Sequence, residues 1–192
     1  MALLDPVHWG TITPPMRDML RFIGRQPFAA RFYLAGGTAL ALRLGHRRSA
    51  DLDFFSVTDE VHQKARREIL DALAPLTPQT LEEVDGNLLL RVSDLHVGFF
   101  SYSYSLLEQT DSVEGIAVAS VVDIGMMKLD ALIGRGSRKD FYDVYVIAQR
   151  VLIPNLLALG RVKYPYARDF EFMAAESMVS FENTLSRGCE IS

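Results

Sequence analysis

Two aspartates, Asp51 and Asp53, are the residues of this chain best suited to hold a metal ion. They lie in residues 50–55, a segment that predicts a β-strand, so their side chains project from one face while Leu52 and Phe54 face a core. Neighbouring carboxylates repel each other unless a cation neutralises them. Mg²⁺ is normally held by one or two carboxylates together with substrate phosphates. The pair therefore predicts a Mg²⁺ or Mn²⁺ site completed by a substrate.

A glycine turn before the aspartates predicts a phosphate site. Residues 32–34 read as a short strand, and Gly36 and Gly37 then allow a tight turn. Thr38 is predicted to cap a helix that stops at Gly45. Backbone N–H groups at a helix start, together with the positive end of the helix dipole, bind anions. A nucleoside triphosphate with magnesium would satisfy the turn and the aspartates together, with Gly36, Gly37 and Thr38 cradling the triphosphate and the aspartates holding the metal.

A lysine and two further aspartates form a second group later in the chain. Lys128 lies on an amphipathic helical segment, and a lysine near the glycine turn would contact phosphates as a point charge. Asp140 and Asp143 fall on one face of the next predicted helix. They are candidates to position the lysine, an arginine or an acceptor hydroxyl, and Asp140 is equally a candidate to offset the helix dipole.

Two motifs in this order resemble a known family. Residues 34–55, from Leu-Ala-Gly-Gly-Thr to Asp-Leu-Asp-Phe-Phe, resemble the first motif of the AbiEii/AbiGii nucleotidyltransferases. These are toxins of abortive-infection and toxin-antitoxin systems within the polymerase-beta-like superfamily. Residues 127–146 resemble the later motif, a helix carrying a lysine followed by a basic-acidic turn. The resemblance spans roughly residues 32–150 and implies a nucleotidyltransferase core.

The resemblance implies roles for individual residues. Lys128 would neutralise the triphosphate, and Arg47 and Ser49 would contact the triphosphate or secure the turn. Supporting positions are Arg135, Asp140 and Asp143. By the same resemblance, the acceptor would be a hydroxyl of RNA, such as the 3′ end of a transfer RNA, or of a protein. The partner would be a cognate antitoxin.

The resemblance is incomplete at one position. Members of the superfamily carry a third acid on a later strand, and Gly98 in residues 95–100 occupies about that place. Asp94, Asp140 and Asp143 are candidates to replace it. A third carboxylate helps to place the metal and activate the attacking hydroxyl. Two hypotheses follow: an active nucleotidyltransferase, or a catalytically weak or inactive nucleotide- or RNA-binding module with the same fold.

The order of elements predicts an α/β (α+β) fold, a nucleotidyltransferase-type mixed sheet flanked by helices. Strands are expected near residues 80–84, 88–92 and 96–102, with the first two joined by the Asp85-Gly86 turn. Helices are expected at residues 14–25, 58–73, 119–133 and 139–149, and again from Pro154 onward. The chain is predicted to divide into a helical segment at 1–30, the core at 31–118 and a helical segment at 119–192 packed on the core.

Composition limits the possible functions. The 192 residues are 49% hydrophobic, enough for a substantial core. Twenty basic and 24 acidic residues give a net charge of −4, which argues against non-specific nucleic-acid binding. Two local groups of basic residues would face the triphosphate, an acceptor backbone or solvent. The first group is Arg43, His46, Arg47 and Arg48, and the second is Arg135, Arg138 and Lys139.

Cysteine usage and hydropathy predict a cytoplasmic protein with no membrane partner. The single cysteine, Cys189, forms no intramolecular disulfide, which fits a reducing compartment. The sequence has neither a signal-peptide pattern nor an uncharged apolar run of membrane-spanning length. The P-loop and dinucleotide-binding patterns are also missing, and the four histidines are too scattered to predict a zinc site.

Overall fold

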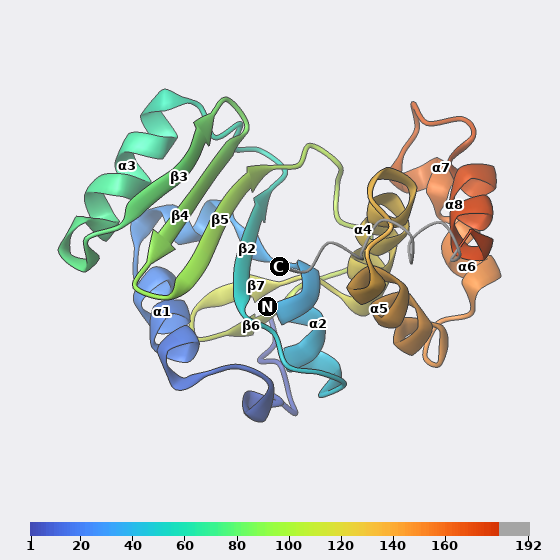
Figure 1. Ribbon diagram of the computed structural model, residues 1–192, viewed down its shortest axis with the longest axis horizontal. Helices are drawn as coiled ribbons and strands as arrows, with labels where there is room; N and C mark the ends of the chain where they lie inside the picture. Colours follow the sequence, from blue (N-terminus) through green and yellow to red (C-terminus); the bar gives the residue numbers. More distant parts are fainter. Residues whose placement is uncertain (181–192) are drawn as a thin grey trace, which may run out of the picture. The chain divides into compact units, whose positions relative to one another are not determined.

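A computed structural model describes residues 1–180 of the chain. It divides into two compact units, the first Met1–Ser120 and the second beginning at Val121. The first unit contains a β-sheet with helices, and the described part of the second is helical (Figure 1). Cys189 lies outside the described residues.

Seven strands of the first unit form one mixed sheet in the order β3-β4-β5-β2-β1-β7-β6. The strands are β1 (Tyr33–Leu34), β2 (Asp51–Ser56), β3 (Gln79–Val84), β4 (Asn87–Val92), β5 (Leu95–Ser101), β6 (Asp111–Val113) and β7 (Ile116–Val118). The pairs β2/β5 and β1/β7 are parallel, and the other neighbours are antiparallel. The mixed sheet and the predicted strands are confirmed. The β6-β7 hairpin was not predicted, because strands of three residues carry too little alternation.

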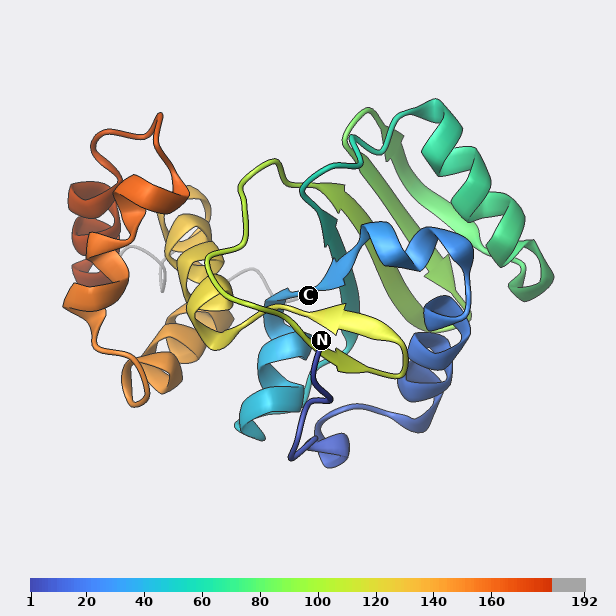
Figure 2. The same ribbon diagram turned by 180° about the vertical axis from the view of Figure 1, so that it is seen from behind.

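Three helices accompany the sheet: α1 (Pro14–Gly24), α2 (Gly36–Leu44) and α3 (Gln63–Leu73). Figures 1 and 2 show α1 and α3 on one face and α2 on the other. Leu52 and Phe54 of β2 and Phe99 of β5 are buried on the α1/α3 side, where Phe28 packs edge-on to Phe99 at 5.7 Å between ring centroids. Burying each such side chain contributes about 1.5–3 kcal/mol. This core fixes which residues of β2 face the opposite side.

Helix α3 begins later than predicted. It starts at Gln63, not at Thr58, and Val61 just before it has a positive φ of 49°. The Ser56 hydroxyl accepts the N–H of Asp59 at 2.8 Å and so holds the preceding loop. Serine and aspartate side chains that bind nearby backbone N–H groups favour turns over helix, which explains the delayed start.

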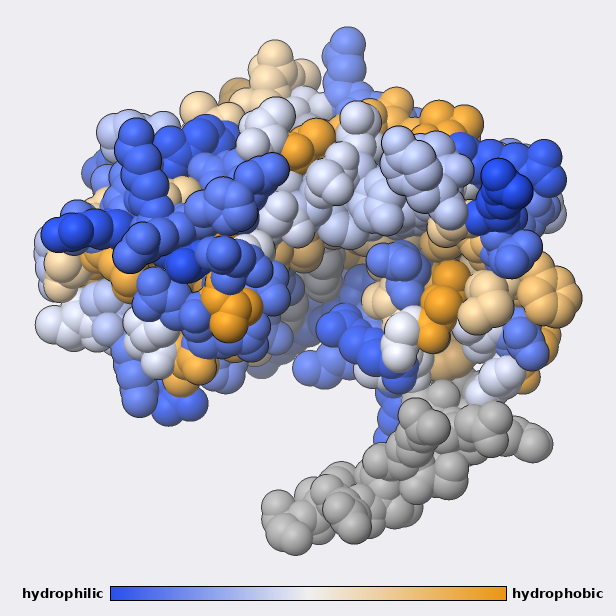
Figure 3. All heavy atoms as spheres, turned by 90° about the horizontal axis from the view of Figure 1, so that it is seen from above, coloured by the Kyte–Doolittle hydropathy of each residue, from blue (hydrophilic) through white to orange (hydrophobic). Residues whose placement is uncertain are grey.

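One basic residue of α3 departs from the expected solvent-facing role. Lys64 and Arg67 are exposed, and Figure 3 shows many hydrophilic side chains on the left, the side on which Figure 1 shows α3. Arg66 is instead buried, and it donates to the Asp85 carboxylate at 2.7 Å and to the Val61 carbonyl at 2.8 Å. Arg66 therefore ties α3 to the β3-β4 turn.

The described part of the second unit consists of α4 (Val121–Gly134), α5 (Arg138–Ala148), α6 (Ile153–Ala158), α7 (Gly160–Lys163) and α8 (Phe170–Val179). A fully buried ion pair joins α7 to α4, with Lys163 Nζ 2.8 Å from Asp123 Oδ1. Within residues 1–180, no single helix is long and apolar enough to cross a membrane. One bent pair, α5 with Ile153–Lys163, meets that test by length and composition alone.

Candidate active site

The paired aspartates lie on one face of β2, opposite Leu52 and Phe54, as the sequence predicted. Burial alternates along β2, with Asp51, Asp53 and Phe55 partly exposed and Leu52 and Phe54 buried. The apolar residues therefore hold the strand in place while the two carboxylates remain accessible.

The glycine turn lies directly against Asp53. The Ala35 N–H donates to the Asp53 carbonyl at 3.1 Å, which fixes the end of β1 beside β2. Gly36 has a φ of +66°, and a Cβ at this position would lie 3.1 Å from Asp53 Oδ2. A side chain there would strain the backbone and crowd the carboxylate. Gly36 thus allows the start of α2 to meet Asp53 closely.

Helix α2 begins at Gly36 with Ala35 as its N-cap, so the prediction that Thr38 caps this helix is wrong. The buried Thr38 hydroxyl instead contacts the Asp51 carbonyl and lies 2.8 Å from Ser49 Oγ. Because Thr38 lies inside the first turn, these contacts tie α2 to the start of β2. The helix itself offers no acceptor to the N–H groups of its first turn, which point outward from its N-terminus.

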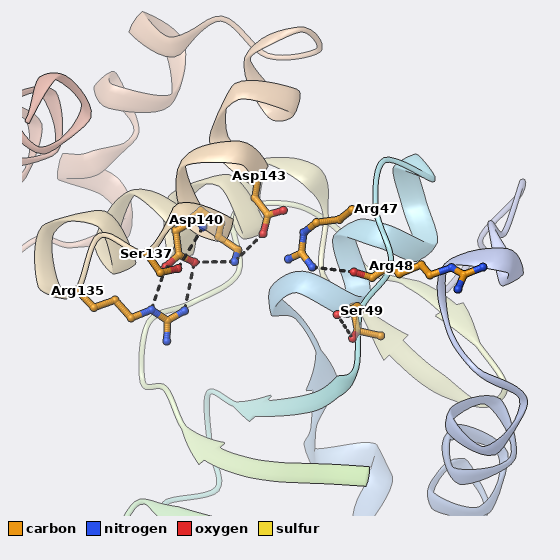
Figure 4. Close-up of polar contacts among 9 residues, drawn as sticks. Arg47, Arg48, Ser49, Arg135, Ser137, Asp140 and Asp143 are labelled. Carbon is orange, nitrogen blue, oxygen red and sulfur yellow. Dashed lines mark hydrogen bonds and ion pairs between the residues drawn. The ribbon is translucent and has the colours of Figure 1, made fainter. Parts of the chain in front are cut away.

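Arg47 lies over the second glycine. A Cβ at Gly37 would be 2.4 Å from Arg47 Nη2, so glycine allows the guanidinium to pack closely on the start of α2. Arg47 Nη1 donates to the Arg48 carbonyl at 3.1 Å (Figure 4). Arg43 has another role, because it donates to the Val118 and Ala119 carbonyls and pairs with Asp111 at 2.8 Å. Of these two arginines, Arg47 is the one beside the glycine turn.

The neighbouring strand β5 supplies the residues opposite the aspartates. In the parallel register Asp51 pairs with His96 and Asp53 with Gly98, so a glycine lies opposite Asp53 on the strand where the third acid was expected. Asp94 lies in the turn before β5. His96 Nδ1 is 3.3 Å from Asp51 Oδ1, a contact that sequence reasoning missed. Only the pairing of distant strands reveals it.

The second group of predicted residues forms a buried cluster within the second unit. Lys128 Nζ lies 2.8 Å from Asp140 Oδ1 and 2.7 Å from Asp143 Oδ2, and all three side chains are at most 8% exposed. Arg135 reaches Asp140 with Nε at 3.0 Å from Oδ2, and Ser137 donates to the same oxygen at 2.6 Å (Figure 4). Ser137 is also the N-cap of α5. Asp140 and Asp143 therefore hold the lysine, one of the roles predicted for them.

Comparisons with known proteins identify the family. The family model "Nucleotidyl transferase AbiEii toxin, Type IV TA system" matches residues 17–105. The uncharacterized protein aq_aa25 of Aquifex aeolicus (strain VF5) is 36% identical over 159 residues, which cover 79% of this chain and 74% of that protein. The chain belongs to the AbiEii nucleotidyltransferase family. It is therefore classed as a nucleotidyltransferase enzyme, as the resemblance implied.

Solved structures similar to this AbiEii-family chain share its fold. The crystal structure of ANT(2″)-Ia with adenylyl-2″-tobramycin has a TM-score of 0.54 at 15% identity, covering 87% of this chain and 99% of that one. A nucleotidyltransferase-like protein from Paracoccidioides brasiliensis has a TM-score of 0.50 at 16% identity, covering 82% and 92%. The expected nucleotidyltransferase-type α/β fold is confirmed.

The donor set of this AbiEii-family chain suits a cation shared with a substrate. Asp51 and Asp53 offer hard oxygen ligands on one partly exposed face. Among residues 1–180, no three His, Cys, Asp or Glu side chains form a group able to hold a metal ion. Two carboxylates without a third are sufficient for Mg²⁺ only when phosphate oxygens and water complete its octahedron. The residues present therefore fit a metal that arrives with a triphosphate.

The buried cluster predicts how stability depends on pH. Burial alone would raise the pKa of Asp140, but hydrogen bonds from Arg135, Lys128 and Ser137 outweigh it and hold the pKa well below its ordinary value of 3.8. The charged Asp140 thus stabilises the fold above that value, and this contribution is lost as the pH falls below it. We expect the stability gap between wild type and Asp140→Asn, measured by urea unfolding, to change little from neutral pH to about pH 5 and to narrow as the pH is lowered from about 4 to about 2. A gap that stays constant would contradict this assignment.

Proposed function

We propose that the protein transfers a nucleoside monophosphate from a nucleoside triphosphate to an acceptor hydroxyl. The observation that carries this proposal is the contact between the glycine turn and Asp53, with Gly36 Cα placed so that a Cβ would be 3.1 Å from the carboxylate. It brings an anion-binding helix start and a cation-binding carboxylate to one point. A triphosphate with a divalent cation is a substrate that requires both.

The proposed site residues of the first unit would each have a distinct role in the reaction. Asp51 and Asp53 would hold the cation, and a bound Mg²⁺ would neutralise the charge that develops on the phosphoryl oxygens. Backbone N–H groups of Gly36 and Gly37 would bind phosphate oxygens, and Arg47 beside them would add positive charge. The acceptor hydroxyl would give up its proton to solvent and its oxygen would form a bond to the α-phosphorus. The bond between the α-phosphorus and the oxygen bridging it to the β-phosphate would break, and pyrophosphate would leave with that oxygen.

Some parts of the proposal come from the family alone. Lys128 is proposed as a triphosphate contact because of its place in the later motif. Asp140, Asp143 and Arg135 would support it, and the contacts among these four residues favour that supporting role. A toxin role paired with an antitoxin is proposed from the family description. A transfer RNA or a protein as acceptor is proposed from the sequence resemblance.

A second function is favoured by Gly98. The position opposite Asp53 lacks a carboxylate, so the group that would help to activate the acceptor hydroxyl is missing from this strand. A nucleotide- or RNA-binding module with weak or absent transferase activity would keep the glycine turn and the aspartates but not this acid. Binding measurements and transfer measurements separate the two functions.

Calorimetric binding of the four ribonucleoside triphosphates tests the shared site first, because it needs no acceptor. We expect magnesium-dependent binding of one or more nucleotides to the wild type, and at least about tenfold weaker binding to Asp51→Asn/Asp53→Asn, since both charged metal ligands are removed. Chelation of magnesium should weaken wild-type binding similarly. Absence of metal-dependent binding in the folded wild type would contradict both functions at this site.

A further inference from the structure

Four aromatic residues continue the face of the sheet that carries the aspartates. We call Phe55, Phe100, Tyr102 and Tyr104 the aromatic strip. Phe55 lies 5.2 Å from Phe100 and 5.9 Å from Tyr102, and Tyr102 lies 5.2 Å from Tyr104, all between ring centroids. Each of the four is partly exposed. The strip is a continuous row of rings with surface left for a ligand.

The strip is separate from the aromatic core on the opposite face of the sheet, and Phe55 joins it to the buried Tyr33 at 6.1 Å between ring centroids. The opposite face has its own aromatic cluster, in which Phe54 stacks on Phe99 at 5.2 Å and Phe28 and Phe32 pack edge-on to Phe99 at 5.7 and 5.4 Å. Those four rings are at most 3% exposed. Partly exposed aromatic rings in a row beside a polar site are typical of surfaces on which bases stack.

The Phe100 ring takes the place of a side chain at the missing-acid position. A Cβ on Gly98 would lie 2.4 Å from two ring carbons of Phe100 and 3.5 Å from Asp53 Oδ1. Only a residue without a side chain lets the ring fold back to this point beside the carboxylate. Gly98 thus leaves room for the Phe100 ring, which forms an aromatic surface next to Asp53, the proposed metal ligand.

The order of groups along β2 assigns a direction to the substrate. Ser49, Arg47 and the glycine turn lie at the start of β2 or beside Asp53, and the aromatic strip follows Asp53 toward the end of the strand. Asp53 and Phe55 are two residues apart on the strand, about 7 Å at the usual rise. In a nucleoside triphosphate the base is separated from the α-phosphate by one ribose. The phosphates would therefore lie at the start of β2 and the base at its end.

We propose that the aromatic strip binds the base of the nucleoside triphosphate by stacking, with Phe100 as its principal ring. This inference rests on the proposed function, because it requires the triphosphate to bind at Asp53. Stacking uses the π-face that every base has, so the strip selects a nucleotide over a bare polyphosphate more strongly than one base over another.

Inorganic tripolyphosphate separates the strip from the phosphate site, because it has the phosphates without a base. The experiment measures calorimetric affinity of the full chain for tripolyphosphate and for each nucleoside triphosphate, with magnesium. In Phe100→Leu we expect about tenfold weaker nucleotide binding and unchanged tripolyphosphate binding. Phe100→Tyr, which keeps a ring, should retain most nucleotide affinity. Phe172→Leu, at an exposed phenylalanine of α8, is the matched control and should bind both ligands as the wild type does.

The possible outcomes separate failure of the proposed base stacking on the aromatic strip from failure of the proposed triphosphate site. Equal loss of both ligands in Phe100→Leu, or no loss of either, would overturn the strip while leaving the phosphate site intact in the wild type. Unchanged nucleotide affinity with reduced transfer to RNA would also overturn it, since the strip would then bind the acceptor. If the folded wild type binds neither ligand, the proposed function itself fails and the strip fails with it.

Discussion

Replacing Asp53 by asparagine is expected to reduce nucleotide transfer at least about 100-fold without unfolding the protein. Asparagine keeps the size and shape of the side chain but removes the charge that would hold the cation. Loss of a metal ligand removes several kcal/mol of transition-state stabilisation, and each 1.36 kcal/mol is about a factor of ten in rate. Incorporation of α-labelled nucleotide into the RNA and protein of a cell lysate measures the change, and the proposed toxin role predicts that any toxicity in a host is lost with it.

A matched control separates local from general effects of charge. Asp71 is an exposed aspartate on α3 of the same unit, so Asp71→Asn changes the net charge equally but should leave transfer at the wild-type level. Transfer that survives in Asp53→Asn would place the metal elsewhere. Transfer undetectable even in the wild type, with magnesium-dependent nucleotide binding intact, would favour the binding module indicated by Gly98.

The part of the site that the sequence predicted is the part encoded by short-range patterns. Alternation along β2 placed Asp51 and Asp53 on one face, and the structure confirms it. Gly36 and Gly37 were predicted to form a tight turn. The positive φ and the contact with Asp53 favour glycine at position 36, and Gly37 leaves room for the Arg47 guanidinium. Such features depend on neighbours within a few residues, which periodicity and backbone preference describe well.

The part that the sequence missed depends on pairing between distant strands. His96 was treated as one of several scattered histidines, yet the parallel register of β2 and β5 brings it to 3.3 Å from Asp51. The Phe100 ring over Gly98 is likewise invisible in the sequence, because it combines a rotamer with a missing side chain. The sequence around Thr38 resembled that of an N-cap, but α2 begins two residues earlier, and the Thr38 hydroxyl contacts the Asp51 carbonyl of β2 instead. Tertiary contacts outweighed the local preference.

Replacing Lys128 by methionine is expected to destabilise the protein by about 3–5 kcal/mol. The ammonium lies within 2.8 Å of both Asp140 and Asp143, and these carboxylates are 1% and 0% exposed. Removing the cation leaves buried negative charges that water cannot solvate, which costs far more than losing an exposed ion pair. Urea unfolding followed by circular dichroism measures the loss.

Two companion variants test whether buried charge is the cause. Arg135 also binds Asp140, but its side chain is 69% exposed, so Arg135→Met should cost only about 0–1 kcal/mol. Lys128→Met/Asp143→Leu removes one of the two carboxylates together with the lysine and should recover part of the lost stability, because a buried ion pair replaced by apolar groups is often nearly neutral. Equal losses in Lys128→Met and Arg135→Met would contradict the explanation.

The variant Lys128→Met also decides whether Lys128 has only a structural role in the buried cluster or contacts the triphosphate as well. If Lys128 only holds Asp140 and Asp143, its replacement would lower the stability of the protein, but the folded variant would keep its magnesium-dependent affinity for nucleotide. If Lys128 also contacts the triphosphate, its replacement would lower both the stability of the protein and its affinity for nucleotide. The affinity for tripolyphosphate would fall as well, because the contact is to phosphate rather than to the base. Tripolyphosphate thus separates the lysine from Phe100, whose replacement should affect only ligands that carry a base. Measuring both ligands on both variants assigns each residue to its end of the substrate.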